Sequence, residues 1–370
     1  MKIGCVKEIK KHEYRVGLTP QCVAAYTAHN HQVTVQEGAG ADAGFDDAQY
    51  AQAGAKIEAD PAKIFAQSDM IIKVKEPQEQ EYALLREGQI LFTYLHLAAD
   101  EEQTKALLDK KVIGIAYETI QQEDGTLPCL KPMSEIAGRL SIQEGAKYLE
   151  RPFGGRGVLL SGVPGVPRGK IVILGGGVVG QNAARIASGM GANTTVLDIS
   201  LNRLAYIDDI YHGTVETLYS NEANIRAVLR DCDLLIGAVL IPGARAPKLV
   251  RREHLSLMKK KSVIVDVAVD QGGCIETTKP TTHDNPTFEV DGVVHYCVAN
   301  MPGAVALTST IALTGATLTY GLAIADLGPE KACKTRADLK RGLNVYRGKC
   351  TFKDVAAAFG LEAFSPDTVL

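Results

Sequence analysis

The stretch KIVILGGGVVGQNAARIASGMGANTTVLD, residues 170–198, decides the fold of the second half of this 370-residue chain. Its opening apolar run, KIVIL, is typical of a buried strand, and the loop GGGVVG follows at once. The alanines and the isoleucine after the loop recur at helical spacing. A Gly-x-Gly-x-x-Gly loop between a strand and a helix is the phosphate-binding turn of a doubly wound, dinucleotide-binding domain.

Each glycine of this loop has its own expected role. Gly175 permits the tight turn, Gly177 lets the backbone approach a pyrophosphate, and Gly180 lets helix and strand pack closely. The helix N-terminus offers its N–H groups to anionic oxygens. Asp198 ends the next apolar run, where a carboxylate binds both ribose hydroxyls and repels a 2′-phosphate. The sequence therefore predicts NAD rather than NADP as the cofactor.

Strand-like runs in this half of the chain alternate with helical stretches and predict a six-stranded parallel sheet. Two groups of three strands are the plan of a doubly wound, dinucleotide-binding domain. We assign this domain to residues 130–306. The runs are KIVIL (170–174), NTTVLD (193–198), TVETLYS (214–220), CDLLIGAVL (232–240), SVIVDVAV (262–269) and VVHYCVAN (293–300).

The first part of the chain also alternates strand-like and helical runs, which predicts a second parallel α/β structure. We assign residues 1–129 and 307–370 to one discontinuous domain, because the tail is too short to form its own core. Ser134 is expected to cap a helix that runs to about Leu149. The predicted fold class is α/β, with two doubly wound, Rossmann-like sheets flanking a cleft.

Residues 304–325 form an uncharged run that is long enough to span a bilayer as a helix. Hydroxyl-bearing side chains and two glycines, Gly315 and Gly321, make the run polar for lipid but suited to close packing within protein. We therefore expect a buried core helix and no membrane partner.

Composition and charge restrict the class of partner. With 40 Lys and Arg against 43 Asp and Glu, the net charge is −3, and no charge block indicates a nucleic-acid partner. The eight cysteines show no CxxC pair and no disulfide-like spacing, and the N-terminus lacks the apolar core of a signal peptide. We expect a cytoplasmic protein that acts on small metabolites.

Four charged or titratable residues follow strand-like runs. Arg15, Lys75 and His96 belong to one edge of the first sheet, and Asp270 ends the fifth run of the nucleotide-binding domain. Ligands bind beyond the carboxyl ends of parallel strands, so these side chains are candidates for substrate binding and catalysis. Each also has a structural alternative: solvated charges for Arg15 and Lys75, a core histidine for His96, and a turn residue for Asp270.

Other patterns point to structure rather than chemistry. GAGADAG (38–44) has the wrong spacing for a phosphate loop and predicts a turn. Cys274 or Cys297 could in principle act as a nucleophile that forms a thioester, but free cysteines are commonly small buried hydrophobic residues. No histidine spacing suits zinc, and we expect no metal.

The chain as a whole resembles the alanine dehydrogenase and pyridine nucleotide transhydrogenase family over nearly its whole length. The resemblance implies an NAD-dependent oxidoreductase that interconverts L-alanine with pyruvate and ammonium, and it implies a homohexamer. It rests on KEIKKHEYRVGLTP, KVKEP, FTYLHLAA, PMSEIAGR, GGVPGV, GGGVVGQNAARIA, VLDIS, GAVLIPGA, VDVAVDQGGC and VANMPGAV.

By the same resemblance, Arg15 and Lys75 hold the substrate, and His96 and Asp270 act as acid and base. The cofactor site that the resemblance implies comprises, besides the loop glycines, Ser134, Val178, Val179, Asp198, Arg203, Ser220, Val239, Leu240, Val267, Lys279, Asn300 and Met301.

The chain departs from the family pattern at two places. Ala306 and Leu307 replace a usual Pro-Arg pair, which affects the start of the following helix. Lys279 stands where Arg is common, which exchanges a planar fork for a point charge.

Two other functions are open at this level. A nucleotide-binding subunit that passes hydride to a membrane partner, as transhydrogenases do, would not turn over alanine alone. A non-catalytic NAD sensor would bind NADH without oxidising an amino acid. The sequence also leaves open the physiological direction and whether serine or 2-aminobutyrate is a side substrate.

Overall fold

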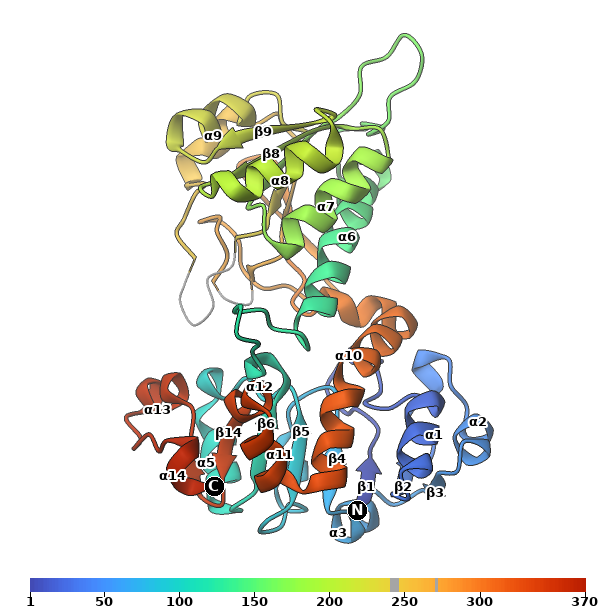
Figure 1. Cartoon of the computed structure of the whole chain (residues 1–370). Coiled ribbons are helices and arrows are strands. Elements are labelled where there is room, and N and C mark those ends of the chain that lie inside the picture. The colour runs from blue at the N-terminus through green and yellow to red at the C-terminus, as the bar shows by residue number, and fades with distance from the viewer. Residues whose placement is uncertain (240–245, 270–271) are drawn as a thin grey trace. The chain divides into compact units, whose positions relative to one another are not determined.

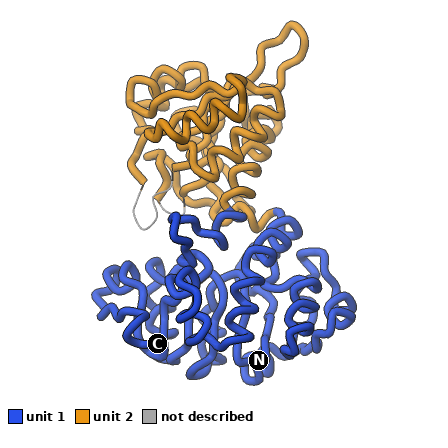
Figure 2. The backbone as a smooth tube through the Cα atoms, in the orientation of Figure 1, with its two compact units in different colours: residues 1–133, 305–370 blue, residues 134–304 orange. Residues whose placement is uncertain are grey.

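The computed structural model describes residues 1–239, 246–269 and 272–370. The backbone forms two compact units, which Figure 2 shows in different colours. Unit 1 comprises Met1–Met133 and Val305–Leu370, and unit 2 comprises Ser134–Ala304. From the sequence, we predict that the chain enters the second domain between residues 129 and 130 and leaves it between residues 306 and 307.

Unit 1 is built on an eight-stranded sheet in the order β15-β14-β6-β5-β4-β1-β2-β3 (Figure 1). The strands from β6 to β3 are parallel, whereas the tail adds an antiparallel hairpin, β14 and β15, beside β6. The tail thus packs on the first part of the chain. The strands are β1 (Lys2–Cys5), β2 (Gln32–Gln36), β3 (Lys56–Glu58), β4 (Met70–Ile72), β5 (Ile90–Thr93), β6 (Ile113–Ala116), β14 (Leu343–Tyr346) and β15 (Lys349–Cys350).

Helices connect the strands of unit 1, and local caps define where several of them begin. Thr19 accepts the N–H of Cys22 at the start of α1, and Asp46 accepts the N–H of Gln49 at the start of α2. The helices are α1 (Pro20–Ala28), α2 (Asp47–Gln52), α3 (Pro61–Gln67), α4 (Glu79–Tyr82), α5 (Glu101–Asp109), α10 (Ala306–Leu327), α11 (Pro329–Thr335), α12 (Ala337–Arg341), α13 (Lys353–Phe359) and α14 (Pro366–Val369).

Short 3-10 helices complete unit 1: η1 (Ala41–Ala43), η2 (Leu97–Ala99) and η3 (Tyr117–Thr119). The GAGADAG segment forms turns and η1, so the structural interpretation of that motif is correct.

The uncharged run forms α10, which is long and apolar enough to cross a membrane but is half buried within the protein. Its hydroxyls bond within unit 1: Thr310 Oγ1 accepts the N–H of Val16 at 3.3 Å, and Thr314 Oγ1 donates to the Thr310 carbonyl at 2.8 Å. A Cβ at Gly321 would lie 1.9 Å from the hydroxyl of Tyr26. The helix is a core element of unit 1, and it begins at Ala306 without the usual Pro-Arg pair.

Unit 2 contains a seven-stranded sheet in the order β12-β13-β11-β10-β7-β8-β9, parallel except for β12. This order confirms the doubly wound prediction. The strands are β7 (Lys170–Leu174), β8 (Asn193–Asp198), β9 (Val215–Tyr219), β10 (Leu234–Gly237), β11 (Val263–Asp266), β12 (Thr287–Val290) and β13 (Val293–Tyr296). The helices are α6 (Lys131–Tyr148), α7 (Val178–Gly189), α8 (Leu201–Tyr211) and α9 (Glu222–Leu229), with η4 (Arg151–Phe153), η5 (Arg252–Leu257) and η7 (Met301–Val305).

Two sequence predictions about these elements are wrong. Ser134 does not cap α6, because the helix begins at Lys131 and already includes Ser134. The fifth run is shorter than predicted, because β11 ends at Asp266, and Asp270 lies outside the described residues.

Candidate active site

The glycine-rich loop joins β7 to α7, as the sequence predicts. Gly175 has a φ of +101°, a conformation that favours glycine. A Cβ at Gly180 would lie 1.8 Å from the carbonyl oxygen of Gly175, so only glycine allows helix and loop to approach this closely. A Cβ at Gly177, the N-cap of α7, would meet no atom within 4 Å. The backbone at Gly177 is therefore accessible to an anionic ligand.

Asp198, the last residue of β8, lies beside this loop. Its Oδ2 accepts the N–H of Gly176 at 2.6 Å, and its Oδ1 accepts the N–H of Ser200 at 2.7 Å. Nη1 of Arg203 on α8 lies 3.5 Å from the same Oδ2, and Ser220 donates its backbone N–H to the Asp198 carbonyl at 3.0 Å. Three residues predicted to bind the cofactor, Asp198, Arg203 and Ser220, are thus brought together.

Two further predicted cofactor residues follow strands of the same sheet. Cγ2 of Val239, which follows β10, would lie 3.0 Å from a Cβ at Gly175. Val267, directly after β11, donates its N–H to the carbonyl of Gly237 at 2.9 Å. The remaining described members are Val178 and Val179 at the start of α7, Ser134 in α6, Asn300 after β13, and Met301 in η7. Leu240 lies outside the described residues.

Lys279 is placed apart from the glycine-rich loop. Its Nζ lies 4.9 Å from the ring centroid of Phe288, on the edge strand β12. Strands β13, β11 and β10 separate β12 from β7 in the sheet. The contact directs this ammonium toward the sheet edge, and a cofactor role for Lys279 stays a prediction.

Arg15 is buried in unit 1 and is not the solvated charge of the structural alternative. Its Nε and Nη2 donate to the two carboxylate oxygens of Glu13, both at 2.6 Å, and its Nη1 lies 3.0 Å from the sulfur of Met133. The side chains of Arg15 and Glu13 are 2% and 1% exposed. Glu13 thus engages the Nε–Nη2 edge of the guanidinium and fixes its plane.

Lys75 follows β4 and is held through its backbone. Oε1 of Glu8 accepts the N–H of Val74 at 2.6 Å and that of Lys75 at 3.2 Å, and the Lys75 carbonyl accepts the hydroxyl of Thr93 at 3.0 Å. Burial and the nearby charge of Arg15 lower the pKa of Lys75. A carboxylate bound beside these two cations would stabilise the charged form of the lysine.

His96 lies just beyond β5, in the left-handed region with a φ of +49°. Glu118 fixes this conformation, because its Oε1 accepts the N–H groups of His96 at 2.6 Å and of Leu95 at 3.1 Å. The ring stacks on Tyr94, with centroids 5.7 Å apart. The side chain is 45% exposed, so the alternative of a core histidine is wrong.

Asp270 lies outside the described residues, so its predicted role stays a prediction. The segment before it is anchored at Asp266, a buried carboxylate. Asp266 Oδ2 accepts the hydroxyl of Thr278 at 2.7 Å, and Oδ1 accepts the N–H of Ala268 at 3.2 Å. Burial raises the pKa of Asp266 despite these hydrogen bonds. This carboxylate is satisfied within the protein and has a structural role.

Cys274 and Cys297, near Asp266, have surroundings that disfavour the thiolate form. Cys274 and Cys297 are both fully buried. Burial raises the pKa of the Cys297 thiol to about 12 and shifts the pKa of Cys274 in the same direction. Because the thiolate is the nucleophile, these environments argue against a thioester route.

The sequence predicted the charged candidates but missed the carboxylates that contact them. Glu13 and Glu76 are within two residues of Arg15 and Lys75, so an acidic residue next to a candidate cation was an available signal. Glu8 and Glu118 were harder to find. Each reaches a residue that follows the neighbouring strand, and only the sheet order brings those loops together.

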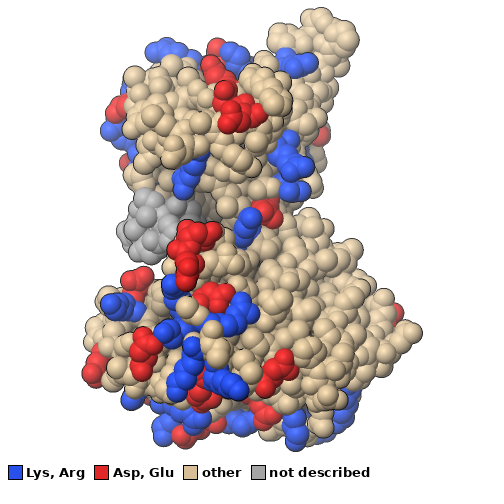
Figure 3. Space-filling model, viewed as in Figure 1, with Lys and Arg blue, Asp and Glu red and all other residues tan. Residues whose placement is uncertain are grey.

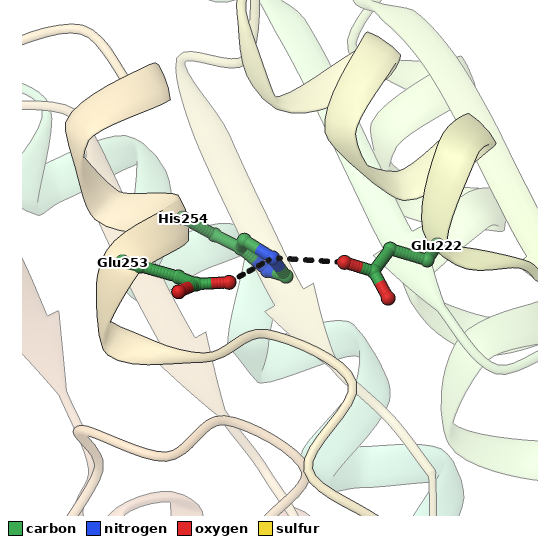
Figure 4. A group of neighbouring side chains, drawn as sticks. All are labelled: Glu222, Glu253 and His254. Atoms are coloured by element: carbon green, nitrogen blue, oxygen red, sulfur yellow. Dashed lines mark ion pairs between the residues drawn. The ribbon is translucent and has the colours of Figure 1, made fainter.

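Among the described residues, Glu222, Glu253 and His254 bring three potential metal-ligand atoms within 4.8 Å of one another (Figure 4). Nε2 of His254 lies 3.7 Å from Glu222 and 3.5 Å from Glu253. Its Nδ1 accepts the N–H of Arg251 at 3.3 Å, so in the neutral ring the proton is on Nε2 and faces the carboxylates. Nη2 of Arg251 also lies 2.6 Å from Glu222 and 3.3 Å from Glu253. This arrangement favours ion pairing over metal binding.

Comparison with known proteins finds relatives that match nearly the full chain. The family model for the alanine dehydrogenase/PNT N-terminal domain matches residues 4–137, and that for the C-terminal domain matches residues 141–353. The chain is 57% identical over 362 residues to the alanine dehydrogenase of Halomonas elongata, covering 98% of both chains. It is 54% identical over 371 residues to alanine dehydrogenase 2 of Staphylococcus aureus, covering 100% of both.

Solved structures give the same result. An L-alanine dehydrogenase superimposes with a TM-score of 0.95 at 51% identity, covering 97% of this chain and 99% of that one. A transhydrogenase from Sinorhizobium meliloti superimposes with a TM-score of 0.83 at 24% identity, covering 95% of this chain and 100% of that one. The second similarity shows the fold alone.

Proposed function

The chain belongs to the alanine dehydrogenase and pyridine nucleotide transhydrogenase family, and we propose that it oxidises L-alanine to pyruvate and ammonium with NAD and catalyses the reverse reductive amination. The observation that carries this proposal is the buried, pre-oriented guanidinium of Arg15 beside Lys75, in a chain 57% identical to an alanine dehydrogenase. Two cations at a strand end suit a substrate that carries a carboxylate and a carbonyl oxygen.

NAD is the cofactor that the residues of unit 2 fit. The accessible backbone at Gly177 suits a pyrophosphate, and the fixed carboxylate of Asp198 suits a ribose diol. Bound NAD would accept the hydride from C2 of alanine, and that chemistry belongs to the cofactor. We assign the other unit 2 residues named above to the same site on the family resemblance.

The residues of unit 1 bind the substrate and exchange its protons. Arg15 orients the carboxylate, and Lys75 stabilises the carboxylate and the carbonyl oxygen of pyruvate. An imidazole can move protons near neutral pH, so His96 serves as the acid/base group for the amine and the hydroxyl. Asp270 activates the water that attacks the imine, or holds ammonium in the reverse direction.

NADH formation at alkaline pH with a panel of L-amino acids tests the proposal. We expect L-alanine to give the highest kcat/KM and serine and 2-aminobutyrate lower values. Faster turnover of another amino acid would overturn the substrate assignment. NADH binding without turnover of any amino acid would favour the sensor, and hydride exchange between nucleotides without alanine would favour the hydride-passing subunit.

We also propose that the chain is cytoplasmic and assembles as a homohexamer. Figure 3 shows a broad face of unit 1, over α1 and α10, with few charged residues. Leu307 and Ile311, one turn apart on α10, are 51% and 54% exposed. An exposed apolar surface of this kind fits an interface between copies. Sedimentation equilibrium measures the assembly, and a monomer at micromolar concentration would contradict it.

A further inference from the structure

Glu76, the residue directly after Lys75, contacts the imidazole of His96. Its Oε2 lies 3.4 Å from Nδ1 of His96, and its Oε1 accepts a hydrogen bond from Nζ of Lys10. The side chain of Glu76 is 11% exposed, whereas those of its two partners are 45% and 43% exposed. A mostly buried carboxylate thus lies behind a histidine that solvent and ligands can reach.

The carboxylate of Glu76 is held in its charged form. Burial alone raises the pKa of Glu76, but the contact with His96 and the charges of Lys10 and Lys75 outweigh it, and the pKa lies well below its usual range. An ionised carboxylate only accepts hydrogen bonds, so the proton that faces it is on Nδ1 of His96. Nε2 is therefore the nitrogen left to exchange a proton with a ligand.

We propose that Glu76 is the positioning residue of the acid/base group: it holds the ring of His96 through Nδ1 and stabilises the imidazolium, while Lys10 on its other oxygen moderates that effect. The inference rests on the proposed role of His96 in proton transfer. The KVKEP motif would then have two functions, because Lys75 binds the substrate and Glu76 orients the ring of His96.

The other groups around His96 do not substitute for Glu76. Glu118 accepts the backbone N–H of His96. This hydrogen bond fixes the main-chain conformation of His96 and does not involve the ring nitrogens. Tyr94 stacks on the ring face, and burial raises the pKa of its hydroxyl, so it stays neutral. Lys10 and Lys75 act on the ring through their effect on Glu76. Among these groups, only Glu76 combines a negative charge with contact to a ring nitrogen.

The pH dependence of kcat/KM in Glu76→Gln and Lys10→Met tests the proposal. Glutamine keeps the shape of the Glu76 side chain but removes the negative charge that stabilises the imidazolium of His96. The limb of the kcat/KM profile that His96 contributes should therefore move about one pH unit lower, and kcat should fall about 10- to 100-fold. Lys10→Met removes the charge that moderates Glu76, so the same limb should move higher. Lys105→Met is the matched control, because Lys105 is 60% exposed and pairs with Glu101 elsewhere in unit 1.

An unmoved limb in both variants would overturn the role of Glu76, whatever happens to stability. If Glu76→Gln does not fold, the upward shift in Lys10→Met still decides, because that lysine is on the surface. Adding Glu76→Gln to His96→Ala should cost no further activity, and a further loss would show that Glu76 acts without His96. A His96→Ala enzyme that keeps both the limb and normal kcat would instead refute the proposed role of His96, a separate outcome.

Discussion

Glu13 and Arg15 form a two-point ion pair in which Nε and Nη2 of the guanidinium donate to Oε1 and Oε2 of the carboxylate, both at 2.6 Å. The backbone N–H of Arg15 also donates to Oε1 of Glu13 at 3.1 Å. The plane of the guanidinium is therefore fixed before any substrate binds. Such pre-orientation lowers the entropic cost of binding a carboxylate in one geometry.

Glu13→Gln should weaken alanine binding without affecting NADH affinity. The amide places an N–H group against one guanidinium donor, so a hydrogen bond and the buried counterion are both lost. We expect kcat/KM for alanine to fall at least about tenfold, or ~1.4 kcal/mol, in steady-state kinetics. Glu87→Gln is the control, because Glu87 is an exposed partner of Lys111 in the same unit. Equal losses of alanine and NADH affinity would indicate misfolding instead.

The lowered pKa of Lys75 predicts an alkaline limb in pyruvate binding. As pH rises through this lowered pKa, the lysine loses its charge, so KM for pyruvate should begin to rise below the ordinary lysine pKa of about 10.4. Lys75→Arg keeps a cation over the whole range and should remove the limb. The pH profile of KM in both proteins measures this effect, and a limb that persists in the arginine variant would assign it to another group.

Lys73 neutralises two buried carboxylates and should be essential for the stability of unit 1. Its Nζ lies 3.2 Å from Glu8 and 3.0 Å from Glu81, and its side chain is fully buried. Lys73→Met leaves both carboxylates buried without a cation, which costs about 3–5 kcal/mol at neutral pH.

The pH dependence of that loss has a definite sign. Burial raises the pKa of Glu8 even in the intact triad, and removal of Lys73 raises it further. The folded variant then takes up protons that the unfolded chain does not, so its deficit should shrink as pH falls toward 5. Urea unfolding at two pH values measures the deficit, with Lys63→Met as the control, because Lys63 is exposed where it pairs with Glu58. A deficit independent of pH would contradict the account.

Asp198 should control the choice between NAD and NADP. Asp198→Ala removes the charge that repels a 2′-phosphate and leaves the guanidinium of Arg203 nearby, so the NAD preference should narrow at least about tenfold, or ~1.4 kcal/mol. Asp198→Asn also removes the charge but keeps an oxygen that accepts a loop N–H. Comparison of the two variants therefore distinguishes the effect of the charge from the effect of the lost hydrogen bonds. Unchanged ratios of kcat/KM in both variants would refute the assignment.

The parallel strands at the centre of each sheet could be predicted from the sequence. The strands at the sheet edges were harder to predict. Apolar runs and the loop at Gly175 are local signals, and they located β7, β8 and α7. β12 went unrecognised although Asp291 and Gly292, both with positive φ, are a typical two-residue hairpin turn between apolar runs. The three-residue β3 gave a weak signal because it is short, and the place of β14 depends on β6, a partner distant in sequence.

The charged candidates of the site could be predicted from the sequence, but the carboxylates that contact them could not. A charged residue after an apolar run is visible along the chain, which is how Arg15, Lys75 and His96 were found. Contacts such as Glu8 to Lys75 depend on the adjacency of β1 and β4, and that adjacency exists only in the folded sheet. The left-handed backbone of His96 likewise depends on Glu118, which follows the neighbouring strand.

The most direct test of the central claim is the mass of NADH formed from L-alanine labelled with deuterium at C2. If the chain removes hydride from C2 of alanine and transfers it to NAD, the NADH carries one deuterium for each pyruvate formed. No NADH, or NADH without the label, would contradict the assignment of this chain as an enzyme that oxidises alanine.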